Sequence, residues 1–195
     1  PVFKSICDKK LYNIPIGMYF HENQLSYPWS PKDNDLKLKR DLHYHFINYS
    51  SSLAANFNLF NSNFHLDSYI LSLSNYLKKM PDHNNFETIN TISKKSSVLY
   101  IGCELNKFID YKIKKGNDIP LVLWNHRWEF DKNPELFFNA LIRLKNEGIP
   151  FELAVLGESF KKYPKIFDQV REELSSNIVH FGYLNSFSEY AKWLW

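Results

Sequence analysis

The sequence predicts an α/β fold made of two Rossmann-like lobes, each built around a parallel sheet. Two observations carry this prediction: short apolar runs alternate with segments of helical period, and the polar stretch 112–118 separates two such blocks. Strands and helices in alternation, with short connections, predict right-handed crossovers and therefore parallel strands. We expect an N-terminal lobe at residues 1–115 and a C-terminal lobe at 118–195. The alternative is that 112–118 is a solvated loop within one domain.

The first block contains three short apolar runs that predict strands, and between them two helical patterns. The strands are expected at 16–20, 57–60 and 98–102. Apolar side chains in steps of three and four, starting near Leu36, predict one long helix. A second helix is expected to begin at the Asn and Ser caps of 61–63 and to end before Pro81. The polar residues 82–97 are expected to form a loop.

The second block has clearer boundaries. Strands are expected at 121–124, 151–156 and 178–181, and the continuous apolar run of the first is typical of a strand covered on both faces. Asn133-Pro134-Glu135 predicts a helix start, because Asn caps and Pro suits the first helical position. Gly148 is expected to end that helix. A further helix is expected around Phe167, Val170 and Leu174.

Composition leaves the partner open and favours an ordinary globular protein. The 195 residues are 44% hydrophobic and 23% charged, and the net charge of +3 is far weaker than that of a dedicated nucleic-acid-binding surface. The two cysteines form no CxxC pair, so free thiols in a reducing compartment are expected. No apolar run is long enough to span a bilayer, and no signal peptide is recognisable. We therefore expect a cytoplasmic protein that does not enter membranes.

One loop combines cations with a predicted helix start. In W-N-H-R-W-E-F-D-K-N, residues 124–133, Arg127 and Lys132 follow a strand and precede a helix. Open parallel sheets bind ligands beyond the carboxyl ends of their strands, and a helix N-terminus attracts anions. A guanidinium, an ammonium and a helix start together suit a diphosphate. The alternative is a pair of solvated surface cations.

The nucleotide-binding motifs that depend on glycine are absent. No G-x-G-x-x-G follows a strand and no Walker A motif occurs, which disfavours dinucleotide oxidoreductases and P-loop NTPases. A nucleoside diphosphate bound without a glycine-rich loop points instead to an enzyme that uses a sugar nucleotide.

A second polar cluster, H-E-N-Q at residues 21–24, follows the first predicted strand. His21, Glu22, Asn23 and Gln24 could bind a sugar or position an acceptor hydroxyl, or they could form a hydrogen-bonded structural loop. A zinc site that also uses His43 and His45 is disfavoured, because these two residues point to different faces of a helix and no zinc-ligand spacing occurs.

An ordered series of motifs gives the sequence a specific resemblance from about Ile16 onward. The series is Y-F-H-E-N-Q-L-x-Y-P at 19–28, F-N-S at 60–62, M-P-D-H at 80–83, W-x-H-R-W-E-x-D-K-x-P-E at 124–135, V-L-G-E at 155–158 and H-F-G-Y-L at 180–184. The chain resembles the tRNA-queuosine α-mannosyltransferases, which are glycosyltransferases of the GT-B fold. Their pattern has further strands before Ile16 and a glutamate segment of the form E-x7-E beyond Trp195. The resemblance therefore implies incomplete lobes and a fragment that is inactive by itself.

The resemblance implies a retaining transfer of mannose from GDP-mannose to the queuosine base of tRNA, with no cofactor and no metal. It places Arg127 and Lys132 on the donor diphosphate and His21 near the donor sugar. Gly157 and Glu158 match a turn on the donor side of the cleft, and His126 together with Glu22, Asn23 and Gln24 is expected to bind donor or acceptor. Two alternatives stay open: a non-catalytic RNA-binding or scaffold fragment of the same fold, and a glycosyltransferase with another acceptor.

Overall fold

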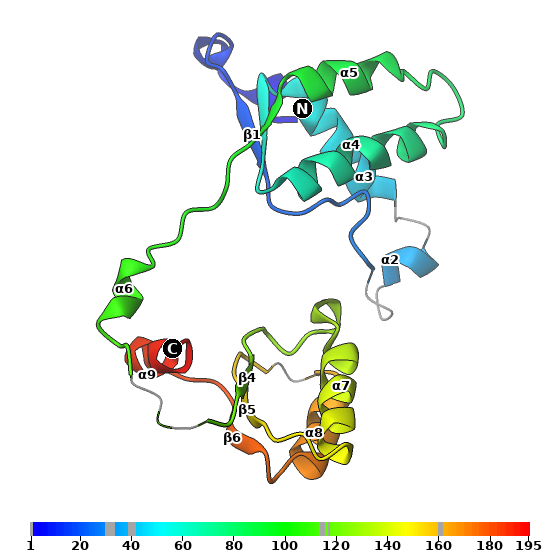
Figure 1. The fold of residues 1–195 in the computed structure, drawn as a ribbon. Coiled ribbons are helices and arrows are strands. Elements are labelled where there is room, and N and C mark those ends of the chain that lie inside the picture. The colour runs from blue at the N-terminus through cyan, green and yellow to red at the C-terminus, as the bar shows by residue number, and fades with distance from the viewer. Residues whose placement is uncertain (1, 30–33, 39–41, 114–115, 117, 160–161) are drawn as a thin grey trace. The chain divides into compact units, whose positions relative to one another are not determined.

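The computed structural model divides the chain into two compact units, Pro1–Cys103 and Glu104–Trp195 (Figure 1). The structure describes residues 2–29, 34–38, 42–113, 116, 118–159 and 162–195. The predicted boundary at 115–118 lies within the second unit, because the short helix before it belongs there. In that helix Phe108 packs against Phe187 and Tyr190, with ring centroids 5.1 and 6.4 Å apart.

The first unit is built on a parallel three-stranded sheet in the order β1-β2-β3. Gly17 lies opposite Phe57 in the β1–β2 pair, and Phe60 lies opposite Val98 in the β2–β3 pair. The core lies between this sheet and its helices, with Phe60, Tyr69 and Leu73 fully buried. In chain order the elements are α1 Val2–Ile6, η1 Lys9–Leu11, β1 Gly17–Phe20, α2 Asn34–Lys37, α3 Leu42–Ala54, β2 Phe57–Phe60, α4 Asn63–Leu77, α5 Glu87–Lys94 and β3 Ser96–Val98.

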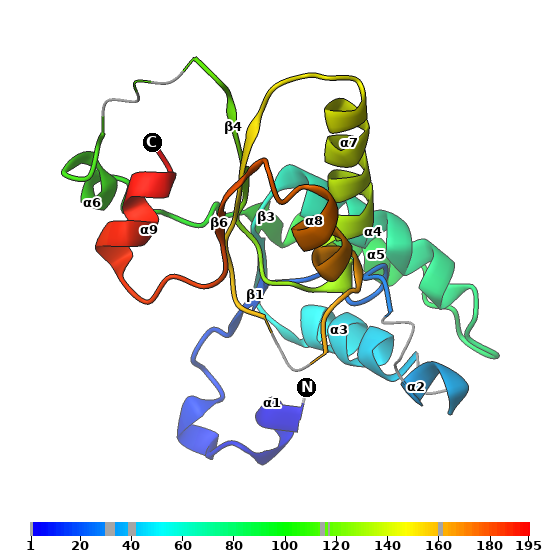
Figure 2. The ribbon, with the colours of Figure 1, turned by 90° about the horizontal axis from the view of Figure 1, so that it is seen from below.

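The second unit repeats this plan with a parallel sheet in the order β4-β5-β6. Figures 1 and 2 both show α7 and α8 on one side of the sheet and α9 on the other. The core beneath α7 and α8 contains Trp124, Trp128, Phe138 and Phe167. The elements are α6 Asn106–Ile109, β4 Leu121–Trp124, η2 Phe130–Lys132, α7 Pro134–Asn146, β5 Glu152–Val155, α8 Ile166–Glu173, β6 Ile178–Phe181 and α9 Phe187–Trp193.

The predicted class, an α/β fold with two Rossmann-like units and parallel sheets, is confirmed. The expected helix start at Asn133 is also confirmed: its side chain accepts a hydrogen bond from the Leu136 N–H, and Pro134 opens α7. Ser62 caps α4 in the same way. These local signals succeed because each satisfies a backbone N–H that a helix leaves unpaired at its start.

Two predictions in the first unit are wrong. Residues 82–97 are not a continuous loop, because α5 forms at Glu87–Lys94 and buries Ile92. The third strand is Ser96–Val98 rather than 98–102, and its last backbone hydrogen bond to β2 is the one that the Leu99 N–H donates to the Phe60 carbonyl. Of the long helix expected from Leu36, the structure describes α2 and α3, while residues 39–41 lie outside the described part.

Candidate functional site

The first candidate loop, residues 21–24, leaves the sheet at the carboxyl end of β1. His21 and Glu22 are exposed, Gln24 is half-buried and Asn23 is buried. The Gln24 amide donates to a Glu22 carboxylate oxygen at 3.0 Å, and Asn23 Oδ1 accepts from the Leu25 N–H at 3.1 Å. The loop therefore presents three polar side chains outward and uses Asn23 to hold its own turn.

The loop is attached to the start of α4. Asn23 Nδ2 donates to Ser68 Oγ at 3.2 Å, and Asn61 Nδ2 donates to the His21 carbonyl at 3.4 Å. The His21 ring packs edge-on against Tyr19, whose hydroxyl donates to the carbonyl of Leu99. The sequence signals in F-N-S and H-E-N-Q thus belong to one hydrogen-bonded corner, where β1 and β2 end side by side.

The second candidate loop follows β4 and is held by the two tryptophans that flank it. Trp124 Nε1 donates to the carbonyl of His126 at 3.0 Å, while Trp128 Nε1 donates to the carbonyl of Leu156 at 2.9 Å. The Trp128 ring is stacked on Phe167, with centroids 4.5 Å apart and planes 5° apart. Buried indoles whose N–H groups are paired give this loop a fixed backbone.

Both cations of this loop are paired with acids that lie close by in the sequence. Arg127 Nη2 is 3.0 Å from a Glu129 carboxylate oxygen, and Lys132 Nζ is 2.9 Å from Asp131 Oδ2. The Arg127 side chain is 55% exposed and that of Lys132 is 32% exposed, so solvent reaches both. A diphosphate that binds here has to replace carboxylates as the partner of these cations. The sequence pattern indicates the two cations but does not predict that acidic side chains pair with them.

The V-L-G-E turn meets the cationic loop through their backbones. Gly157 has φ +94°, and a Cβ at this position would lie 2.0 Å from the carbonyl oxygen of His126. The Trp128 N–H donates to the carbonyl of Glu158 at 3.1 Å, and the Glu158 side chain is exposed. His126, Arg127, Gly157 and Glu158 are therefore brought together at the carboxyl edge of the second sheet, as ligand sites of parallel sheets require.

The two candidate loops belong to different units. His21, Glu22, Asn23 and Gln24 lie in the first, and the remaining predicted site residues lie in the second.

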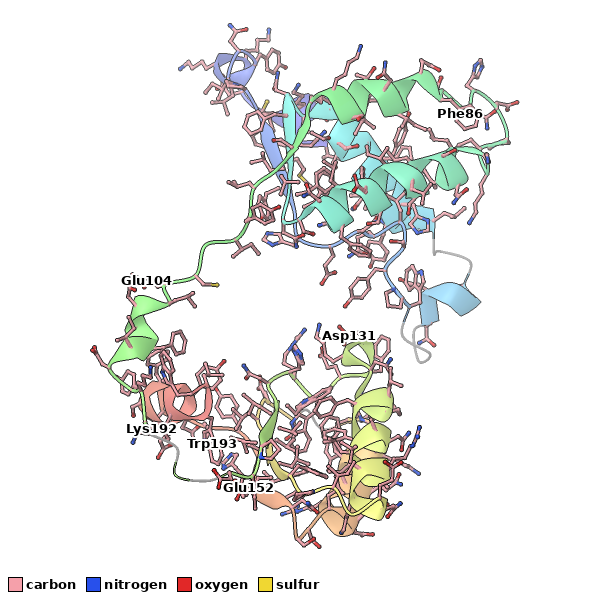
Figure 3. The ribbon with its side chains drawn as sticks, viewed as in Figure 1. Phe86, Glu104, Asp131, Glu152, Lys192 and Trp193 are labelled. Carbon is pink, nitrogen blue, oxygen red and sulfur yellow. The ribbon has the colours of Figure 1, made fainter. Side chains whose placement is uncertain are left out.

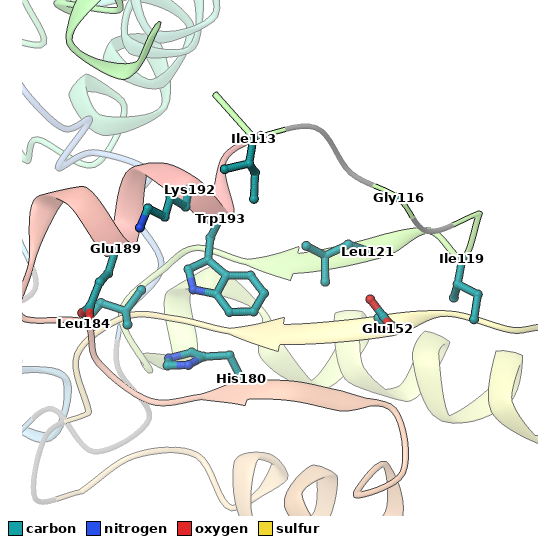
Figure 4. A pocket seen from close by; sticks show the side chains of 10 residues that line it. All are labelled: Ile113, Gly116, Ile119, Leu121, Glu152, His180, Leu184, Glu189, Lys192 and Trp193. Carbon is teal, nitrogen blue, oxygen red and sulfur yellow. The ribbon is translucent and has the colours of Figure 1, made fainter. Parts of the chain in front are cut away.

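A pocket of about 620 Å³ opens elsewhere in the second unit (Figure 4). Trp193 of α9 and His180 of β6 line it, with their ring centroids 5.4 Å apart, and none of the predicted site residues does. Figure 3 shows Glu152 of this pocket and Asp131 of the cationic loop at opposite ends of the unit. We place the candidate chemistry at the cationic loop, because the pocket walls are mostly apolar.

The described part of the chain contains neither a metal-ligand cluster nor a membrane-spanning helix. There, no group of three or more His, Cys, Asp or Glu side chains could hold a metal ion. Among the same residues, no helix combines the length and the apolar character needed to cross a bilayer.

Comparisons with known proteins support the family resemblance that the sequence motifs indicate. The family model described as tRNA-queuosine alpha-mannosyltransferase N-terminal matches residues 1–103, which end where the first compact unit ends. The chain is also similar to the tRNA-queuosine alpha-mannosyltransferase of Drosophila melanogaster, with 36% identity over 185 residues. The match covers 91% of this chain and 48% of the relative, so the chain spans about half the length of that protein.

Proposed function

The chain belongs to the tRNA-queuosine α-mannosyltransferase family, and we propose that it carries part of the machinery that transfers mannose to queuosine in tRNA. The proposed reaction is a retaining transfer from GDP-mannose by a GT-B enzyme of the cytoplasm, with the two units as acceptor-side and donor-side lobes. The observation that carries the proposal is the match to the family. The arrangement of the cationic loop supports it independently.

The second unit is the proposed donor side. A diphosphate at the carboxyl edge of its sheet would meet the Arg127 guanidinium and the Lys132 ammonium close to the positive end of the α7 dipole. Arg127 offers a planar fork for two phosphate oxygens, and Lys132 supplies a mobile point charge. On arrival of the donor, Glu129 and Asp131 would give up these cations to the phosphates.

The ion pairs suggest how such a site would remain usable without the donor. The Arg127–Glu129 pair is largely exposed and contributes little to stability, so a diphosphate with one negative charge on each phosphate can readily displace Glu129. Displacing Asp131 from Lys132 costs more, because the Asp131 side chain is only 7% exposed. Glu129 and Asp131 would hold the cations near their working positions until a stronger anion replaces them. As the sugar–phosphate bond breaks, charge that builds on the departing GDP is stabilised by the same groups.

The first unit is the proposed side for the sugar and the acceptor. His21, Glu22 and Gln24 present donors and acceptors at the carboxyl edge of its sheet, and their loop is tied to α4. Sugar hydroxyls are recognised by polar groups fixed in this way. His21 is proposed to lie near the donor sugar, with Glu22, Asn23, Gln24 and His126 binding donor or acceptor.

The proposal is tested with the full-length protein, radiolabelled GDP-mannose and two tRNA samples that differ only in queuosine. Label transferred to the queuosine-containing tRNA alone supports the proposal. Binding of both tRNAs without transfer would support the non-catalytic RNA-binding alternative. Transfer to an acceptor other than queuosine would support the glycosyltransferase with a different acceptor.

A further inference from the structure

His65 lies in the first turn of α4, directly behind the H-E-N-Q loop, and is only 6% exposed. Its ring packs edge-on against Phe60, with centroids 5.1 Å apart and planes at 87°. Nδ1 lies 3.1 Å from Asn61 Oδ1, while Nε2 is buried and has no hydrogen-bond partner among the described residues. A buried histidine with one ring nitrogen engaged and the other unpaired needs an explanation.

The hydrogen bonds around Asn61 determine which ring nitrogen carries the proton. Asn61 Nδ2 donates to the His21 carbonyl at 3.4 Å, which turns the amide oxygen toward His65. The Ser62 hydroxyl donates to that same oxygen at 3.1 Å. An amide oxygen can only accept, so Nδ1 of His65 must be the donor, and the neutral ring carries its proton there.

His65 also takes part in the second attachment of the loop. The Ser68 hydroxyl donates to the His65 carbonyl at 3.0 Å, and the same hydroxyl oxygen accepts from Asn23 Nδ2 at 3.2 Å. Both ends of the segment from His21 to Asn23 are thus fastened to groups that His65 orients, one through its ring and one through its backbone.

We propose that His65 is a positioning residue for the H-E-N-Q loop: its Nδ1–H orients the Asn61 amide, which holds the carbonyl of His21. The consequence for catalysis rests on the proposed function of that loop. Fixing the carbonyl restricts the backbone at His21 and thereby the directions its side chain can take. Small displacements of a group that contacts substrate reduce turnover strongly, which gives a buried neighbour this influence.

Burial and the neighbouring backbone act on the ring in opposite directions. Burial lowers the pKa of His65 below its ordinary value of 6.5, and the backbone of Glu22 partly offsets this effect. At neutral pH the ring is therefore uncharged, and its contact with Asn61 Oδ1 assigns the single ring proton to Nδ1.

The test compares two amide substitutions that mimic different ring nitrogens. In His65→Asn the side-chain N–H₂ can take the place of Nδ1, whereas in His65→Gln the amide reaches the place of Nε2. Amide hydrogen exchange of residues 21–25 is measured in the 195-residue chain and in both variants. Exchange should rise by on the order of tenfold in His65→Gln and stay within about twofold in His65→Asn. Equal exchange in the two variants overturns the proposal.

A second measurement needs no variant and so does not depend on their folding. The ring nitrogen shifts of His65 in the unaltered chain, recorded by NMR at pH 7.5, should show the neutral form protonated at Nδ1. A ring protonated at Nε2 overturns the proposal.

Transfer kinetics of the full-length variants then separate this proposal from the function assigned to the loop. We expect kcat to fall by on the order of tenfold in His65→Gln and to be largely retained in His65→Asn, with GDP affinity unchanged in both. If loop exchange differs as expected while transfer is unaffected, His65 still positions the loop, and the loop's proposed role in the reaction is wrong.

Discussion

Replacement of Gly157 by alanine should destabilise the second unit more than replacement of any other glycine that has a positive φ there. The new Cβ would lie 2.0 Å from the His126 carbonyl oxygen and 2.7 Å from its carbon, and both are backbone atoms. The carbonyl cannot simply turn aside, because it accepts the hydrogen bond of Trp124 Nε1. The loop backbone must therefore move by about 1 Å or the turn must open.

Two contributions make up the expected cost. An alanine held at φ +94° is strained by about 1–2 kcal/mol. Moving the His126 carbonyl weakens its hydrogen bond to a buried indole, which costs roughly another 1–2 kcal/mol. The expected loss in the free energy of unfolding is therefore about 2–4 kcal/mol. For a unit of this size, each kcal/mol lowers Tm by roughly 4–8 °C.

The matched control is Gly148→Ala. Gly148 also has a positive φ, +74°, but a Cβ there would meet nothing within 4 Å. This variant carries backbone strain alone, so it should lose about 1–2 kcal/mol. Urea denaturation followed by tryptophan fluorescence compares the two, since Trp124 and Trp128 report on this core. If Gly157→Ala lowers the free energy of unfolding by no more than Gly148→Ala does, the close approach of the Gly157 and His126 backbones does not fix the loop.

Three further predictions concern the remainder of the chain. Tyr69→Phe removes a buried hydroxyl that lies within hydrogen-bond distance of both the Asn48 carbonyl and Ser52 Oγ, and should lower the free energy of unfolding of the first unit by about 1–2 kcal/mol in urea; a change below about 0.5 kcal/mol would contradict it. Because burial lowers the pKa of His65 below 6.5, this histidine is protonated at a higher pH in the unfolded chain than in the folded chain. The free energy of unfolding should therefore fall as the pH drops from 6.5 toward the folded pKa. His65→Asn should reduce that slope between pH 7.5 and 5.5, and an unchanged slope would exclude His65 as its source. Exposed apolar side chains such as those at 99–101 should make the 195-residue chain self-associate in light scattering, whereas a strictly monomeric chain would speak against this.

Elements with strong local signals could be predicted from the sequence. The cap at Asn133 with Pro134 sets the start of α7, and the apolar run 121–124 becomes β4 without change. Two elements could not be predicted, because their signals depend on distant partners. Helix α5 is only eight residues long and has Ile89 and Ile92 as its only aliphatic side chains in the described structure, so its sequence offers a single i, i+3 repeat, and Ile92 completes the core.

The third strand was misplaced for a related reason. Ser96 and Ser97 look like loop residues, yet Ser96 Oγ accepts from the buried Asn58 across the sheet and donates to the Ile92 carbonyl. A polar pair that hydrogen-bonds across the sheet in this way leaves no apolar pattern in the sequence. Strand register in such cases is determined by hydrogen bonds between segments far apart in the chain.

The sequence predicted which loops form the candidate site. It did not predict the contacts between the residues of those loops. The positions of Arg127 and Lys132 after a strand were legible, whereas their pairing with Glu129 and Asp131 depends on side-chain geometry. The contact between Gly157 and His126 joins segments from two strands. The only feature of His65 that the sequence shows is its position three residues after the Ser62 cap. This position does not indicate that His65 lies against the H-E-N-Q loop.

Arg127→Ala in the full-length protein tests the central claim most directly. Steady-state transfer to queuosine-containing tRNA is measured together with GDP affinity, and Arg127→Lys serves as the control for charge without the planar fork. We expect Arg127→Ala to raise the activation barrier by on the order of 2–4 kcal/mol, because charge builds on the leaving GDP in the transition state. The loss in the free energy of GDP binding should be smaller than this increase. Arg127→Lys should restore only part of the loss. Turnover left intact, or turnover and GDP affinity reduced equally, would contradict a leaving-group role and reduce Arg127 to a surface charge.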